Sequence, residues 1–367
     1  MLSLIPIIAG IVTSQNVFEP HSEPVYGVNI GGWLVAEPWI TPTLFETHDV
    51  ADEYSLGMKL GPDSARQYLK KHWDSFYNEA DFLRIASWGI NLVRIPIGYW
   101  AFDPNPAPYV KGAAEYLDKA VVWARKANLK VLIDLHGAPG SQNGFDNSGR
   151  AGRATWQPSD PRTPEVIRMI TARYHKDSDT VIGIEVLNEP APWALNLSLP
   201  QIATYFDAAY KEVRKISPSN EAGSIAVWFH DSFTNYAKWN NTFLQPNYQK
   251  LILDTHHYEV FNPPTVNASV ECHIAGVCNA GKVAAIYSQT NLPVVFGEWA
   301  GALTDCTKYL NGYKKGTRFE GTLDEVNNIK YGSCKEATVP IAKWSKKRRI
   351  DTRRFIEAQL VILFSYF

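Results

Sequence analysis

The sequence lacks an excess of charge of either sign, and its N-terminal apolar run is short. Thirty-six basic residues balance thirty-seven acidic ones and leave a formal net charge of −1, so no overall field draws the chain to nucleic acid or to an anionic membrane surface. The apolar run Leu2–Val12 is too short to cross a bilayer. These shortages favour a neutral partner, and we expect neither nucleic acid nor a membrane to be one.

Cysteine is scarce too, and its spacing is not that of a metal site. All four cysteines lie in the last hundred residues, and none shows the paired CxxC spacing typical of zinc ligands. In an exported chain we expect disulfides instead, with Cys306 paired to Cys334. The histidine-rich stretch "DTHHYE" indicates no metal either, because the neighbouring side chains His256 and His257 point to opposite faces of a strand. We therefore expect no metal and no cofactor.

The N-terminus indicates export. An apolar run followed by the small residues Thr13 and Ser14 is typical of a secretory signal peptide, here residues 1–14, although it lacks a basic start. A buried N-terminal segment is the alternative. Three N-x-S/T sequons are compatible with a secreted glycoprotein: Asn196, Asn240 and Asn267.

What the sequence does contain is an alternation of short apolar runs and amphipathic segments such as 113–128. Strands that are apolar throughout and alternate with helices indicate a parallel sheet covered on its outer side. No Gly-rich phosphate loop follows the first run, as it would in a doubly wound nucleotide-binding sheet. We predict a single α/β domain with the (β/α)8 TIM barrel fold, whose strands lie within residues 25–35, 91–100, 129–137, 180–190, 223–230, 250–260 and 292–300.

Polar side chains stand where these strands end, which is where the chemistry of a barrel collects. The run "TVIGIEVLNEP" leads to Glu189, and "LPVVFGEWA" contains Glu298. Two carboxyls facing each other across a barrel mouth suit hydrolysis of a glycosidic bond, in which one protonates the leaving oxygen and the other attacks or activates water. The residues alone leave open whether the reaction retains or inverts the anomeric configuration. We interpret Glu185 as a buried supporting partner, and His230 and His257 as packing or hydrogen-bonding residues.

These motifs belong to longer strings that resemble a known family. They look like the fungal exo-1,3-β-glucanases of glycoside hydrolase family 5, in order from about Tyr26 to Leu360: "VNIGGWLVAEPWITPTLFE", "VRIPIG", "DLHGAPGSQNGFDNSG", "VLNEP", "HHYEVF", "FGEW" and "FIEAQL". The resemblance implies a retaining mechanism, with Glu189 as proton donor, Glu298 as nucleophile and carboxyl groups about 5–5.5 Å apart. It also implies a monomer, secreted or in the cell wall, that releases glucose from the non-reducing ends of β-1,3-glucans; a β-1,6 preference stays open.

The resemblance implies further roles around the two glutamates. One set would support them: Arg94, His136, Asn188, His256 and Tyr258. A second set would contact the terminal glucose: Glu37, Asp146, Asn147 and Asn311. Two aromatic rings would clamp the next sugar as it leaves: Phe145 and Phe261.

The chain departs from the family at its end. Relatives continue for several dozen residues past "EAQL" and supply an eighth strand, whereas this sequence stops at "VILFSYF". We expect one glycoside hydrolase barrel domain over residues 15–367, incomplete at the C-terminus, with the eighth strand truncated or replaced. Val361–Phe367 is the candidate substitute strand, and Cys272 is a candidate partner for Cys278. A truncated, inactive glucan-binding relative is the alternative function.

Overall fold

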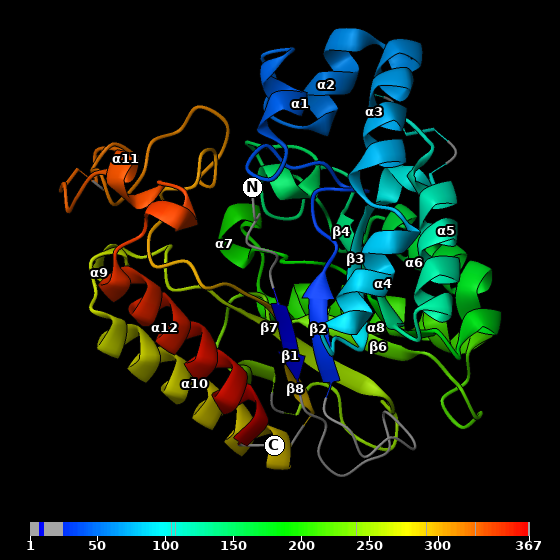
Figure 1. Ribbon diagram of the computed structural model, residues 1–367. Helices are drawn as coiled ribbons and strands as arrows, with labels where there is room; N and C mark the ends of the chain where they lie inside the picture. The colour runs from blue at the N-terminus through cyan, green and yellow to red at the C-terminus, as the bar shows by residue number, and fades with distance from the viewer. Residues whose placement is uncertain are drawn as a thin grey trace.

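The computed structural model describes residues 7–10, 25–103, 105–106, 108–239, 241–290, 292–326 and 328–365, and its centre is a closed β-barrel (Figure 1). Strands follow one another around the barrel in chain order, and β2 to β8 run parallel. This confirms the predicted TIM barrel. The strands are β1 (Ile7–Gly10), β2 (Val25–Asn29), β3 (Leu92–Gly98), β4 (Lys130–Gly137), β5 (Val181–Glu185), β6 (Ala226–His230), β7 (Leu251–His257) and β8 (Val294–Trp299).

The eighth position of the barrel is filled by β1, which pairs antiparallel with both β2 and β8. The expectation of a replaced strand is thus right, but the expected segment is wrong. Val361–Ser365 is the last part of helix α12 (Lys346–Ser365), and the remaining Tyr366 and Phe367 lie outside the described residues. Strand β1 falls inside the predicted signal peptide, residues 1–14, which stays a prediction.

Helix α12 forms because its apolar side chains repeat at helical spacing and have a partner surface. Phe355 and Ile362 are seven residues apart and pack with Val270 and Val277 of α10 (Val270–Thr290). The two helices lie side by side on the outside of the barrel (Figure 1). Burial of this apolar face therefore holds the segment as helix.

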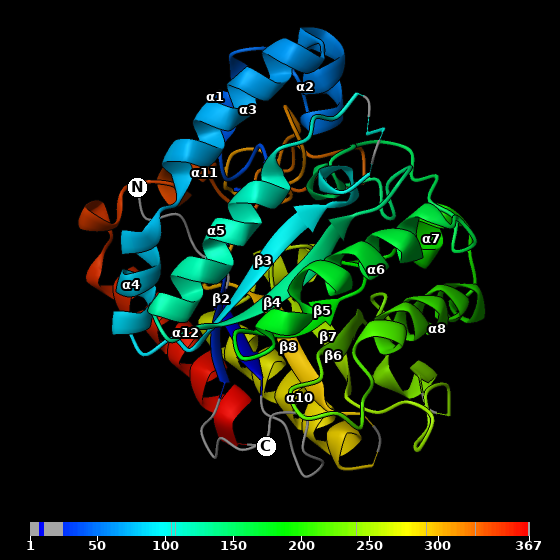
Figure 2. The same cartoon turned by 90° about the vertical axis from the view of Figure 1, so that its right-hand side faces the viewer.

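The other helices cover the barrel as the sequence pattern predicts (Figure 2). The expected helix at 113–128 is α5 (Ala113–Lys126), and its buried face includes Leu117, Ala120 and Val121. The remaining helices are α1 (Pro42–Glu46), α2 (Glu53–Leu60), α3 (Pro62–Phe76), α4 (Glu79–Ser87), α6 (Arg162–Tyr174), α7 (Pro192–Leu195), α8 (Leu199–Ile216), α9 (Pro263–Val266) and α11 (Cys334–Ala337), with short 3-10 turns at Tyr99–Ala101, Asp146–Ser148, His175–Asp177, Tyr236–Trp239 and Ile341–Lys343. Within the described ranges, no helix combines the length and apolar character needed to cross a membrane.

Two segments stand above the carboxyl ends of the strands: the helices α1 to α3 after β2, and the long connection 300–338 after β8 (Figure 1). They contact each other, because Lys308 and Tyr309 bind the carboxylate of Glu46, and Tyr313 and Lys314 bind that of Asp49. The mouth of the barrel is therefore bordered by chain from both ends of the sequence.

The cysteines are partly as predicted. Cys306 and Cys334 form the expected disulfide. Cys272 and Cys278 are both free, so their proposed pairing is wrong. Both lie on α10, six residues apart, which separates their Cα atoms by about 9 Å along the helix, beyond the roughly 7 Å that a disulfide can bridge.

Candidate active site

Arg94, on β3, is the centre of a buried hydrogen-bond network at the carboxyl ends of the strands. Its side chain is fully buried, and it donates to Glu185 Oε2 at 2.7 Å, Glu298 Oε1 at 2.9 Å and Asn188 Oδ1 at 2.8 Å, with Asp134 Oδ2 at 3.0 Å. Burial raises the pKa of Glu185 well above its usual range despite the charge of Arg94. Glu185 is placed as the buried support that the sequence predicts.

Glu298, on β8, is held as a carboxylate. Besides Arg94, the hydroxyl of Tyr258 donates to its Oε2 at 2.8 Å. Burial by itself would raise the pKa of Glu298, but the positive charges of His256 and Arg94 outweigh it, with help from His136 and Tyr258, and lower the pKa to about 2. An ionised carboxylate that is only slightly exposed is a suitable nucleophile.

Glu189 lies just beyond β5, and His256 contacts both Glu189 and Glu298. Nδ1 of His256 lies 2.8 Å from Oε1 of Glu189 and 3.5 Å from Oε2 of Glu298. Both glutamates therefore have an oxygen within contact distance of one imidazole nitrogen. The backbone of Glu189 is left-handed, with φ of 45°, a conformation that non-glycine residues adopt mainly at constrained sites.

His136 and Glu37 are two further buried residues whose charges interact with each other, and His136 and Glu37 each interact with Glu298 as well. Nδ1 of His136 lies 2.5 Å from Oδ2 of Asp134. Burial disfavours the protonated ring, but Asp134 and Glu37 outweigh it and raise the pKa of His136. Glu37 is buried, which raises its pKa, and its Oε2 accepts from Nε1 of Trp39 at 2.8 Å.

The loop after β4 reaches Glu189. Nδ2 of Asn147 donates to Oε2 of Glu189 at 3.3 Å. Loss of solvent, with the negative charges of Glu37 and Asp52, raises the pKa of Asp146 to about 7, and its Oδ2 has no hydrogen-bond partner among the described residues. Phe145 is 41% exposed. The loop thus offers polar groups and an open aromatic ring near Glu189.

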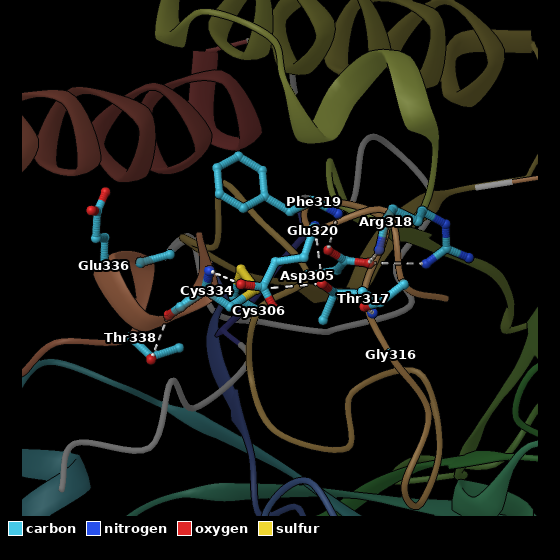
Figure 3. The surroundings of a disulfide bond; sticks show 12 residues. Asp305, Cys306, Gly316, Thr317, Arg318, Phe319, Glu320, Cys334, Glu336 and Thr338 are labelled. Atoms are coloured by element: carbon cyan, nitrogen blue, oxygen red, sulfur yellow. Dashed lines mark hydrogen bonds and ion pairs between the residues drawn. A yellow bond between two sulfur atoms is a disulfide. The ribbon is translucent and has the colours of Figure 1, made fainter. Parts of the chain in front are cut away.

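The connection after β8 carries the predicted residue Asn311. Figure 3 shows another part of this connection, the surroundings of the disulfide with Asp305 and Arg318. Asp305 is buried within the connection. Its carboxylate accepts from the backbone N–H groups of Arg318 and Phe319, and from Nδ2 of Asn311 at 3.0 Å. Oδ1 of Asn311 accepts from Arg318 at 2.6 Å. The amide of Asn311 is therefore engaged within the connection, while Arg318 lies over the ring of Phe261, 5.8 Å from its centroid.

Two groups of side chains have ligand atoms close enough to share a cation: Glu189, His230 and His256, and Glu185, Asp254 and His256. Both groups overlap the hydrogen-bond network of the site, in which His256 contacts Glu189 and Glu185 accepts from Arg94. Burial disfavours the protonated form of His256, but Glu298, Asp254 and Glu189 outweigh it and raise its pKa well above the usual range. A protonated ring is a hydrogen-bond donor and no metal ligand.

Comparisons with known proteins agree with this chemistry. The family model described as Cellulase (glycosyl hydrolase family 5) matches residues 60–334. The chain belongs to glycosyl hydrolase family 5. It is 45% identical to the probable glucan 1,3-beta-glucosidase A of Neosartorya fischeri over 97% of this chain and 83% of that protein, and 43% identical to the glucan 1,3-beta-glucosidase of Blumeria graminis over 94% and 81%.

A solved structure supports the fold. The rutinosidase from Aspergillus niger matches with a TM-score of 0.64 at 24% identity, covering 73% of this chain and 77% of that one. The chain is thus a glycoside hydrolase of family 5, and this solved structure shares its barrel fold.

Two further residues belong to this family 5 site and were not predicted from the sequence. Asn29 of β2 accepts from Arg94 at 3.1 Å and donates to the carbonyl of Gly297. Asp254 of β7 lies 3.6 Å from Nε2 of His256 and accepts from the N–H of Gly297 at 2.6 Å. Asp254 was detectable, because it precedes His256 by two residues and shares its face of the strand. Asn29 gave no comparable signal.

Proposed function

We propose that this family 5 enzyme is a retaining exo-β-1,3-glucanase that releases glucose from the non-reducing ends of β-1,3-glucans. The observation that supports the mechanism is His256 Nδ1, which lies within 3.5 Å of an oxygen of both Glu189 and Glu298. Two carboxyls thus meet at one imidazole, as is needed for a pair that flanks one glycosidic bond. The names of the relatives from Neosartorya fischeri and Blumeria graminis support the β-1,3-glucan substrate.

In the proposed reaction the two glutamates act in turn. The carboxylate of Glu298 attacks the anomeric carbon of the terminal glucose, while protonated Glu189 gives its proton to the glycosidic oxygen, which leaves with the shortened glucan. Glu189 then takes a proton from water, whose oxygen attacks the anomeric carbon and displaces Glu298. Two inversions at one carbon leave its configuration unchanged. Arg94 and Tyr258 hold Glu298 ionised and in place.

The proposed substrate contacts are made by side chains of the site, among them one with a polar atom that lacks a hydrogen-bond partner in the described part of the chain. Nδ2 of Asn188 is buried without a hydrogen-bond partner among the described residues, and it would donate to a glucose hydroxyl. The further proposed glucose contacts are Glu37, Asp146 and Asn147, with Phe145 and Phe261 as the clamp for the leaving sugar. The proposed contact of Asn311 rests on the resemblance alone, because both ends of its amide have partners within the connection.

We also propose that the protein acts as a secreted, monomeric glycoprotein, outside the cell or in its wall. The apolar start of the sequence and the sequons support this. Asn196 and Asn267 are exposed, as glycan acceptors must be, and Asn240 lies outside the described residues.

The test is glucose release from laminarin by the purified chain. We expect β-glucose as the first product, seen by proton NMR before it mutarotates, and faster hydrolysis of β-1,3- than of β-1,6-linked glucan. Glu298→Gln should lose almost all activity, because an amide cannot form the glucosyl-enzyme.

Glu320→Gln is the matched control, because Glu320 lies in the connection after β8 and binds the backbone of Cys334. We expect it to keep wild-type activity. If α-glucose were the first product, it would contradict the assignment of Glu298 as nucleophile. If the chain bound laminarin without hydrolysing it, the alternative function of an inactive glucan-binding protein would be favoured.

A further inference from the structure

Glu259 is a nearly buried carboxylate that lies outside the hydrogen-bond network of the site. Its side chain is 9% exposed, and it directly follows Tyr258, which donates to Glu298. Nε2 of His257 lies 2.8 Å from its Oε1, and Nδ1 of His273 lies 3.5 Å from its Oε2. A buried carboxylate is stable only with such partners, so the position of Glu259 depends on these two rings.

Glu259 is ionised in this position. Loss of solvent by itself would raise the pKa of Glu259, but hydrogen bonding and charge from His257 and His273 outweigh it and lower the pKa to about 2. A carboxylate only accepts hydrogen bonds, so Nε2 of His257 is the donor. This hydrogen bond joins the two residues on either side of Tyr258.

Helix α10 leaves room for the carboxylate of Glu259. His273 and Gly276 are three residues apart and therefore share one face of the helix. A Cβ at Gly276 would lie 2.5 Å from Oε1 of Glu259, so a side chain at this position would occupy the space of the carboxylate. His273 is buried, and its ring centroid lies 5.5 Å from that of Phe355 on α12. The two outer helices thus form a packed seat for Glu259.

The contact with α10 bears on Glu298 through Tyr258. Successive side chains of an extended segment point to opposite sides. Tyr258 follows His257, the last residue of β7, and its hydroxyl reaches Oε2 of Glu298 at 2.8 Å. Glu259 is bound on the other side, at α10. A rotation of the chain that withdraws the hydroxyl of Tyr258 from Glu298 would also pull Glu259 from its seat.

We propose that Glu259 is a positioning residue, which fixes Tyr258 against Glu298 by anchoring the chain after β7 to His273 and Gly276 of α10. The inference rests on the proposed function, in which Glu298 is the nucleophile. Glu259 acts through Tyr258, while its own carboxylate faces the outer helix. The packing of α10 and α12 outside the barrel thereby helps to keep the nucleophile ionised.

The test is the rate at which a 2-deoxy-2-fluoroglucoside with a good leaving group labels Glu298 between pH 2 and 7. In Glu259→Ala we expect this rate to fall at a pH about 0.5–1 units higher during acidification than in the wild type, because the hydrogen bond from Tyr258 weakens. Glu259→Gln should restore most of the wild-type behaviour, since its amide oxygen still accepts from His257. The double variant Tyr258→Phe, Glu259→Ala should shift no further than Tyr258→Phe alone.

Two glycines of α10 provide matched variants. Gly276→Ala displaces Oε1 of Glu259 and should shift the labelling in the same direction as Glu259→Ala. It keeps Glu259 itself and decides the inference even where Glu259→Ala does not fold. In Gly281→Ala the new Cβ would lie 2.2 Å from Cγ2 of Ile362 on α12, so it strains the same helix pair at a different point. We expect Gly281→Ala to be labelled with the pH dependence of the wild type.

Labelling of Glu259→Ala and Gly276→Ala that falls at the wild-type pH would overturn the inference. So would additive shifts in the double variant, or equal shifts in Gly276→Ala and Gly281→Ala, which a merely structural role would give.

Titration of the carboxyl carbon of Glu298 by NMR, assigned with Glu298→Gln, measures the pKa without turnover. A higher pKa in Gly276→Ala than in the wild type supports the anchor, and an unchanged one overturns it. A wild type in which Glu298 is not labelled at any pH overturns the proposed function alone.

Discussion

The guanidinium of Arg94 donates to Oε1 of Glu298 at 2.9 Å from a fully buried position. The same guanidinium contacts four more residues of the network. Its planar group of N–H donors therefore binds partners on several sides. A lysine would keep the charge but present a single ammonium group.

Arg94→Lys should therefore lower kcat/KM on laminarin by about 100-fold, the range seen when a fixed electrostatic donor is lost from an active site, without a comparable change in KM. Steady-state kinetics at constant pH would show this, with circular dichroism to confirm folding. Lys126→Arg is a control, because Lys126 makes an exposed ion pair with Glu79 on the outer helices. Equal activity of Arg94→Lys and the wild type would contradict the role of the planar group.

Tyr258→Phe should change the pH dependence of the reactivity of Glu298, the proposed nucleophile. The hydroxyl of Tyr258 donates to Glu298, whose pKa is lowered to about 2. Without that hydrogen bond the pKa of Glu298 rises by about one pH unit or more. Glu298 attacks only when ionised, so its reactivity should be lost at a higher pH during acidification than in the wild type.

The measurement is the rate at which a 2-deoxy-2-fluoroglucoside with a good leaving group labels Glu298 between pH 2 and 7, because this step needs no proton donor. Tyr331→Phe serves as a control, since Tyr331 lies on the connection after β8. If the labelling rates of Tyr258→Phe and the wild type fell at the same pH during acidification, the prediction would be contradicted.

Gly297→Ala should disturb the site by a steric route. A Cβ at this position would lie 2.0 Å from Oδ2 of Asp254, so the carboxylate near His256 would have to move. We expect an unfolding free energy lower by about 1–3 kcal/mol and a reduced kcat. In Gly301→Ala the new Cβ would meet only the mobile end of Ile356, at 2.8 Å. Urea unfolding and kinetics of the two variants should differ clearly; matching values would contradict the argument.

Removal of the disulfide should destabilise the connection after β8. Cys306 and Cys334 close a loop with a sequence separation of 28, and loss of this constraint on the unfolded chain costs about 3–4 kcal/mol. The double variant Cys306→Ser, Cys334→Ser should show this by urea unfolding. Cys272→Ser, at a free and exposed position, should match the wild type. A double variant as stable as Cys272→Ser would exclude a stabilising role for the disulfide.

The alternation of apolar runs and amphipathic helices predicted the barrel, because residues on one strand or helix face recur at fixed spacing in the chain. The same local patterns singled out Glu189 and Glu298 at strand ends, and helix α5 within two residues of its C-terminal bound. The structure brings these glutamates together with Arg94, His256 and Tyr258.

Other features depend on contacts between segments far apart in the chain, which no local pattern encodes. Val361–Ser365 is apolar enough for a strand, but it continues helix α12, whose Phe355 and Ile362 pack against α10. The role of Asn29 depends on Arg94 and Gly297, which come from two other strands. The low pKa of Glu298 likewise results from charges contributed by β3 and β7. The sequence by itself determined which side chains stand at the strand ends. Closure of the barrel decided which of these side chains form hydrogen bonds and shift each other's pKa, because electrostatic interactions depend on distance in space.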